Sequence, residues 1–190
     1  RSRGLGDVYK RQEYNNMVSL LMEGETGTVL QHNGGYEKVA QGTLNKLMTV
    51  LLTAEEIESG GLSINDVVTV SSNANAQTGA VVWLMPGEEI TIEELLKSVI
   101  IGNANDASVA LAEIVGGNEE EFTGMMNARA FELGMRNTVF KNPAGYDCAG
   151  QYSTPYDMAL LCRELLKHEF LYKIMNTWID SCLLYTSPSP

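Results

Sequence analysis

The chain has 190 residues, of which 44% are hydrophobic and 19% charged, a composition typical of a globular protein with a sizeable core. Its formal net charge of −11 argues against nucleic acid or an anionic membrane surface as the main partner. No apolar run is long enough to span a bilayer, and the three cysteines and two histidines form no ligand cluster or disulfide framework. We therefore expect no metal and no other cofactor.

The two ends of the chain differ in composition from the middle. Residues 1–12 carry four basic groups and one acidic group without helical or strand periodicity, whereas the middle is acidic and periodic. Residues 182–190 carry no charge and close in Ser-Pro repeats. We interpret both stretches as non-native flanks, and we expect residues 13–181 to form one partial domain.

The first third of the chain predicts a β-hairpin followed by a buried helix. Two short strands, Met17–Met22 and Thr28–Gln31, flank a glycine-containing loop, which is a hairpin signal. From Thr43 to Ser59 the apolar residues recur at helical spacing, and Gly60-Gly61 ends the run. We expect this helix to bury one face in the core.

Two short β-like runs follow this helix. Val67–Val70 alternates as a strand does, and a polar stretch separates it from a second β-like run, Ala80–Leu84. Within that run Trp83 is expected to pack in the interior, and lining a substrate groove is the alternative. Thr91 with Glu94 three residues later is a capping box for the next helix.

The second half of the chain predicts a succession of helices, each with an apolar stripe and a capping or terminating residue. They begin at Thr91, at Asn105 or Asp106, near Glu119 and at Thr154, and they end at Gly102, Gly116-Gly117, Gly134 and Lys167. A short strand is expected near Thr138–Phe140, ahead of a Pro-Gly loop. A strand pair followed by a block of helices with minor strands predicts an α+β fold.

Two short segments carry side chains suited to chemistry. Thr43 and Lys46 share a face at the start of the first helix, which brings a hydroxyl and an amine together. A partly desolvated lysine has a lowered pKa and can take a proton from a hydroxyl nucleophile. The turn Gly102–Asp106 offers amide groups for an acyl substrate. By spacing alone, the more common explanation of the first segment is a helix N-cap followed by a surface lysine. For the second segment it is helix capping.

Several collinear stretches carry a resemblance to a known family. They are LLMEGETGTVL, NKLMTVLLTAEE, LMPGEEITIEELLKSVIIGNANDASVALAE, and ELGMRNTVFKNPAGYD followed by YSTPYDMALLCRELL. In this order they resemble the serine D-alanyl-D-alanine carboxypeptidases, the low-molecular-mass penicillin-binding proteins, over nearly all of Met17–Trp178. The resemblance implies a β-lactamase/transpeptidase-like α+β domain, with an antiparallel sheet flanked by helices beside a mostly helical lobe. It also implies that residues 13–181 are truncated before the last strands of the sheet.

The catalytic motifs of that family are S-x-x-K, S-x-N and K-T-G. Lys46 matches the lysine of the first motif, whereas the nucleophile position holds Thr43, which keeps the hydroxyl and adds a methyl group and a stiffer χ1. Asn105 matches the asparagine of the second motif, whereas its serine position holds Asn103, whose amide cannot relay a proton. No K-T-G occurs in the chain. By resemblance these four residues are the candidate catalytic groups, and Asn105 also binds substrate.

The resemblance implies a bacterial cell-wall enzyme. Such an enzyme removes the terminal D-alanine from peptidoglycan stem peptides ending in D-Ala-D-Ala through an acyl-enzyme, and β-lactams acylate the same residue. It acts outside the cytoplasmic membrane and reaches that membrane only through segments missing from this chain. Because both motif serines are replaced, a catalytically silent relative that binds cell-wall peptide and an inactive fragment are the alternatives.

Overall fold

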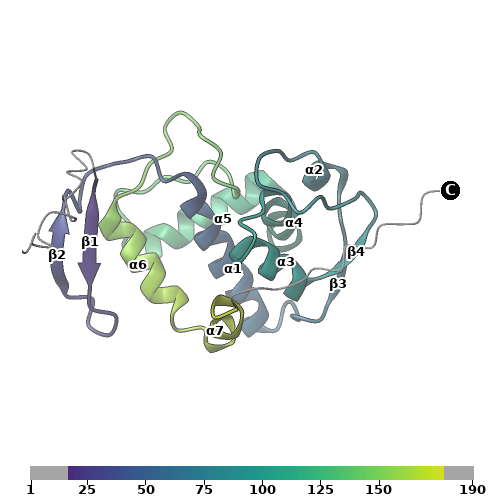
Figure 1. The fold of residues 1–190 in the computed structure, drawn as a ribbon, viewed down its shortest axis with the longest axis horizontal. Helices are drawn as coiled ribbons and strands as arrows, with labels where there is room; N and C mark the ends of the chain where they lie inside the picture. Colours follow the sequence, from purple (N-terminus) through teal and green to yellow (C-terminus); the bar gives the residue numbers. More distant parts are fainter. Residues whose placement is uncertain (1–16, 178–190) are drawn as a thin grey trace, which may run out of the picture.

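The computed structural model describes residues 17–177 of the chain, so the predicted flanks 1–12 and 182–190 lie outside the described residues. A β-hairpin lies at one end of the molecule and a block of helices at the other, and the long helix α1 (Asn45–Ser59) runs between them (Figure 1). The strands are short and antiparallel. The predicted α+β class is confirmed.

The hairpin consists of β1 (Ser19–Met22) and β2 (Val29–Asn33), which pair antiparallel as predicted. Its turn is closed by the Glu23 carboxylate, which accepts hydrogen bonds from the Thr26 hydroxyl at 2.6 Å and from two backbone N–H groups. The bond from Thr26 is the largest of the effects that lower the pKa of Glu23 to about 2. The hairpin is therefore locally determined.

Helix α1 is buried on almost all sides. It follows a single 3-10 turn, η1 (Gly42–Leu44), and it ends at Gly60, whose φ of 83° lies in the left-handed region that glycine tolerates. The side chains of Met48 and Leu51 are fully buried. A helix that is buried around its circumference is a central element of the core, so α1 is a rigid support for the residues at its N-terminus.

The second small sheet pairs β3 (Val67–Thr69) with β4 (Glu89–Thr91), and the short helix α2 (Ser72–Asn75) follows β3. The predicted strand Ala80–Leu84 is wrong, because this stretch forms an irregular loop. The expectation that Trp83 packs in the interior is also wrong, since this residue is 76% exposed.

The remaining helices follow the predicted order. They are α3 (Ile92–Ile100), α4 (Asn105–Gly116), α5 (Glu119–Glu132), α6 (Pro155–Leu165) and an unpredicted α7 (Glu169–Met175). The capping box at Thr91 and the N-cap at Thr154 are confirmed. Capping of α4 by Asn105 or Asp106 is wrong, because both residues already lie within the helix and Ala104 occupies the N-cap without a side-chain bond.

The helices are joined by ionic contacts as well as by apolar packing. Arg129 of α5 contacts Glu55 of α1 at 2.7 Å and Glu164 of α6 at 3.3 Å. In place of the strand expected near Thr138–Phe140, Val139 makes a single bridge to Tyr152. No helix among residues 17–177 has the length and apolar character needed to cross a bilayer. Within the same range no three His, Cys, Asp or Glu side chains gather into a metal-binding group.

Candidate active site

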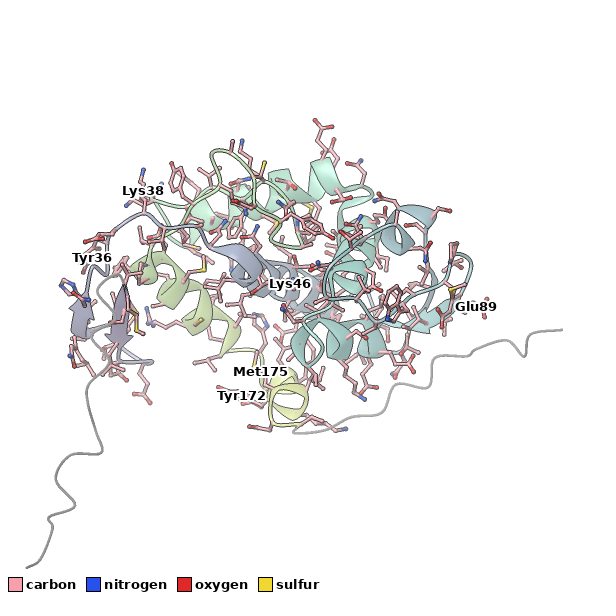
Figure 2. The ribbon with its side chains drawn as sticks, turned by 45° about the horizontal axis from the view of Figure 1, so that its top comes forward. Tyr36, Lys38, Lys46, Glu89, Tyr172 and Met175 are labelled. Atoms are coloured by element: carbon pink, nitrogen blue, oxygen red, sulfur yellow. The ribbon has the colours of Figure 1, made fainter. Side chains whose placement is uncertain are left out.

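The two residues of the first predicted motif lie where the chain enters α1. Thr43 is in the 3-10 turn and is exposed, whereas Lys46 lies in the first turn of α1 and is only 4% exposed. Figure 2 shows Lys46 near the middle of the molecule, on α1. Thr43 is therefore accessible to solvent while Lys46, one turn later, is enclosed by protein.

Burial changes the chemistry of Lys46. Desolvation lowers the pKa of its amine from 10.5 to about 8, because removal from water disfavours the charged form. The Lys46 Nζ donates a hydrogen bond of 2.7 Å to the carbonyl oxygen of Ala144. Within residues 17–177 it makes no hydrogen bond to Thr43 Oγ1, so the amine is bonded to the loop at Ala144 and not to the nucleophile position.

The loop that receives this hydrogen bond, residues 142–146, packs across the start of α1. The carbonyl oxygen of Pro143 accepts hydrogen bonds from Thr49 Oγ1 of α1 at 3.0 Å and from Ser108 Oγ of α4 at 2.9 Å. Gly145 approaches the backbone of Gly42 so closely that a Cβ on it would lie 2.7 Å from the Gly42 carbonyl carbon. The loop is thus fixed against both helices that carry the predicted motifs.

From the sequence, residues 142–146 are predicted only as a Pro-Gly loop between elements, with no part in the site. The signal available is the run NPAGY, in which Pro143 fixes its own φ and Gly145, two residues later, permits a positive φ. Nothing in that run reveals that its carbonyl groups bind side chains almost a hundred residues earlier.

Asn105, of the second motif, is the first residue of α4 and is buried. Its Nδ2 donates to the carbonyl oxygen of Thr78 at 2.6 Å, and its backbone N–H donates to Ala80 at 2.7 Å. The Tyr146 hydroxyl donates to the same Thr78 carbonyl at 3.0 Å. These bonds join the loop before β4, the start of α4 and the 142–146 loop into one unit beside Lys46.

Asn103, at the serine position of the second motif, stands apart from this network. Its side chain is exposed, and its backbone has a φ of 52°, in the left-handed region. Among residues 17–177 the other non-glycine residue with positive φ is Trp83, at 63°. A Cβ on Gly102 would lie 3.5 Å from Val82, so the two strained residues occupy neighbouring loops. Strain of this kind collects at functional sites.

Asp106 explains the irregular conformation of the loop that contains Trp83. Its buried carboxylate accepts the backbone N–H of Leu84 at 3.1 Å and that of Val82 at 3.1 Å, so these groups are not available to a neighbouring strand. Trp83 lies between the two donors, and its positive φ is incompatible with a β-strand. Asp106 thus shapes the loop beside the site, whereas the sequence predicts it only as a candidate helix cap.

The described residues therefore provide an exposed hydroxyl at Thr43, a buried amine of lowered pKa at Lys46 and a buried amide at Asn105, around one loop. A hydroxyl beside a base is the arrangement that nucleophilic catalysis uses. The structure brings Thr43, Lys46 and Asn105 onto adjacent ends of α1 and α4 and leaves the Asn103 side chain in solvent.

Comparison with known proteins identifies relatives along most of the chain. Residues 8–184 match the family model of peptidase S11, D-alanyl-D-alanine carboxypeptidase. The chain is 44% identical over 162 residues to the D-alanyl-D-alanine carboxypeptidase DacF of Bacillus subtilis, covering 85% of this chain and 42% of that protein. It is 37% identical over 153 residues to DacC of Escherichia coli, covering 77% and 38%. The chain thus spans less than half the length of these relatives.

Solved structures agree with this assignment. The D-alanyl-D-alanine carboxypeptidase DacD from Francisella tularensis has a TM-score of 0.81 and 33% identity, covering 83% of this chain and 38% of that one. Penicillin-binding protein 5 from Haemophilus influenzae has a TM-score of 0.79 and 29% identity, covering 83% and 47%. The predicted transpeptidase-like fold is confirmed. Because the family model matches residues 8–184, the chain belongs to the peptidase S11 family of D-alanyl-D-alanine carboxypeptidases.

Proposed function

We propose that this chain carries the nucleophile half of the active site of a cell-wall D-Ala-D-Ala carboxypeptidase. The Thr43 hydroxyl attacks the carbonyl carbon of the last amide of a stem peptide ending in D-Ala-D-Ala. An ester forms between Thr43 and the shortened peptide, and D-alanine leaves with the proton that its nitrogen requires. Water then hydrolyses the ester and restores the hydroxyl. The substrate places the protein outside the cytoplasmic membrane.

The observation that carries this proposal is the state of Lys46. An amine with a pKa of about 8 is neutral in roughly a tenth of molecules at pH 7, far more often than an exposed lysine, and only the neutral form accepts a proton from Thr43. It lies three residues after the exposed hydroxyl, in the first turn of a rigid helix. Family membership supplies the reaction class, and the buried amine supports Thr43 as the group that performs it.

Asn103 favours a second candidate function, peptide binding without turnover. An amide side chain donates and accepts hydrogen bonds but does not relay a proton to a leaving amine. Loss of one positioned proton-transfer group slows a reaction by about 10² to 10⁴. A protein that binds the stem peptide through Asn105 and the neighbouring loops, and hydrolyses it very slowly, fits this substitution.

Acylation of the full-length protein separates the two functions. We expect a fluorescent penicillin to form a covalent adduct that mass spectrometry assigns to the peptide containing Thr43. Thr43→Ala abolishes the adduct, and Thr43→Ser retains it. Thr69→Ala, which removes an exposed threonine of β3, serves as the matched control and leaves labelling unchanged.

Two results would argue against the carboxypeptidase. An adduct that persists in Thr43→Ala would move the nucleophile to another residue. Saturable binding of a D-Ala-D-Ala peptide, with neither an adduct nor release of D-alanine, would establish the binding protein instead.

A further inference from the structure

The amide side chain of Asn142 closes the loop that holds Lys46, and Gln151 Nε2 supports it from outside by donating to the Tyr146 carbonyl at 2.9 Å. The Oδ1 of Asn142 accepts hydrogen bonds from the backbone N–H of Gly145 at 2.6 Å and of Tyr146 at 2.9 Å. Its Nδ2 donates to the carbonyl oxygen of Tyr146 at 2.9 Å. One side chain therefore closes the turn 142–146 on itself.

The same turn is anchored to α1 on either side of the Asn142 side chain. The carbonyl oxygen of Asn142 accepts a hydrogen bond from Asn45 Nδ2 at 2.9 Å, and that of Ala144 accepts from Lys46 Nζ at 2.7 Å. Gly145, with a φ of 87°, rests against the backbone of Gly42 and Thr43. The position of the Ala144 carbonyl therefore depends on the closed shape of the turn.

We propose that Asn142 is a positioning residue for Lys46: by closing the 142–146 turn it keeps the Ala144 carbonyl on the amine and keeps water away from it. This inference rests on the proposed function and adds a residue that acts on the base rather than on the substrate. Without the amide, the N–H groups of Gly145 and Tyr146 lose their acceptor. The turn is then held only by its bonds to other segments, such as those from Thr49 and Ser108 to the Pro143 carbonyl, and its Gly145–Tyr146 end can loosen and admit water to the amine.

The test is the titration of Lys46 itself, which needs no substrate. The full-length protein is labelled with trace acetic anhydride across the alkaline pH range, and mass spectrometry quantifies acetylation of Lys46 relative to the exposed Lys173. We expect half-titration near pH 8 in the parent protein. In Asn142→Ala we expect it to move toward 10.5, because water stabilises the charged amine.

Asn127→Ala is the matched control. Asn127 also bridges the backbone of one residue, since its Oδ1 accepts from the Phe140 N–H and its Nδ2 donates to the Phe140 carbonyl, both at 2.9 Å. It lies on α5, and within residues 17–177 its side chain makes no hydrogen bond to the 142–146 turn, so we expect its loss to lower stability without moving the Lys46 titration. A Lys46 profile in Asn142→Ala that superimposes on the parent profile would refute the inference.

Hydrogen exchange keeps the inference testable if Asn142→Ala does not fold. In the parent protein the amides of Gly145 and Tyr146 are expected to exchange more slowly than that of Gly150, whose N–H donates to no acceptor within residues 17–177. Equal exchange rates at the three positions would show that the Asn142 side chain does not close the turn.

Acylation measured in the same samples separates this inference from the proposed function. A shifted Lys46 titration in Asn142→Ala supports the positioning role even if no penicillin adduct forms in the parent. A parent that is acylated at Thr43, with an unshifted titration in Asn142→Ala, supports the function and rejects the positioning role.

Discussion

Lys46 shows how one side chain takes its chemistry from its surroundings. An exposed lysine releases its proton only near pH 10.5, whereas the amine of Lys46 is enclosed by α1 and the 142–146 loop and its pKa falls to about 8. The partner of the amine is a backbone carbonyl rather than a carboxylate, so this partner carries no negative charge that would raise the pKa again. Burial without an ion pair therefore prepares this lysine to act as a base.

This burial also makes stability depend on pH. Below about pH 8 the amine is protonated in both the folded and the unfolded chain, and enclosing its charge opposes folding. Between about pH 8 and 10.5 the folded protein releases the proton while the unfolded chain retains it, so the free energy of unfolding rises with pH. The contribution of Lys46 is at most about 3 kcal/mol.

Urea unfolding at pH 8 and at pH 10 measures this effect. We expect Lys46→Met to remove the rise that the parent protein shows. Lys173→Met, which removes an exposed amine, retains it. The same pH dependence in the parent and in Lys46→Met would contradict the assignment of the shift to this residue.

At the scale of elements, the site depends on how closely one loop approaches one helix. A Cβ on Gly145 would lie 2.7 Å from the carbonyl carbon of Gly42 and 2.9 Å from the Cα of Thr43. These distances are too short for a real Cβ, so the loop and the 3-10 turn that carries the nucleophile position would have to move apart. Glycine at position 145 is therefore a requirement of the contact between the loop and the 3-10 turn η1 that precedes α1.

A pair of alanine substitutions separates this contact from backbone strain. Gly145→Ala and Gly150→Ala both place a side chain at positive φ, 87° and 81° respectively, which costs about 1 to 2 kcal/mol. At Gly150 the nearest atom to the new Cβ is 3.9 Å away, so no further cost is expected. Overlap at Gly145 adds about 1 to 3 kcal/mol. Denaturant titration of both variants measures the difference in the free energy of unfolding. Equal losses would show that a Cβ at position 145 does not overlap the backbone of Gly42 and Thr43.

At the scale of the whole molecule, the hairpin is attached to the helical block mainly along α6. Figure 1 shows α6 beside β1, and Arg163 of α6 donates hydrogen bonds to the carbonyl oxygens of Gly24 and Glu25, both at 2.9 Å. Within residues 17–177, β1 pairs with β2 and with no other strand. Leu21 and Leu30 are 56% and 61% exposed on this two-stranded sheet. Apolar strands with unpaired edges promote association between copies of a chain.

We therefore expect the 190-residue chain alone to bind a hydrophobic dye and to associate in a concentration-dependent manner. The double variant Leu21→Lys and Leu30→Lys should reduce both signals, because charged side chains protect exposed strands. Light scattering and dye fluorescence are the measurements. The exposed Phe131 of α5, changed to Lys, is the control for simple removal of an apolar surface group. A parent chain that stays monomeric and binds no dye would contradict the prediction.

Much of the fold is encoded in local patterns. The hairpin, the helix that ends at Gly60, the capping box at Thr91 and the N-cap at Thr154 all appear where the sequence predicts them. Each depends on hydrogen bonds or side-chain spacing within a few residues, which sequence patterns report directly. The spacing of Thr43 and Lys46 belongs to the same class, although the structure places Thr43 in the 3-10 turn η1 and only Lys46 in the first turn of α1.

Only the tertiary structure decided how these residues are surrounded. The run Ala80–Leu84 has the composition of a strand, yet Asp106 binds its N–H groups from 22 to 24 residues away. The residues around Lys46 in the sequence do not predict its burial, because the carbonyl that accepts its hydrogen bond belongs to Ala144, 98 residues later. Sequence patterns report bonds between neighbours, whereas the environment of a side chain depends on distant segments that meet only when the core packs. The sequence by itself determined the elements and the candidate hydroxyl and amine, and packing decided the protonation of that amine.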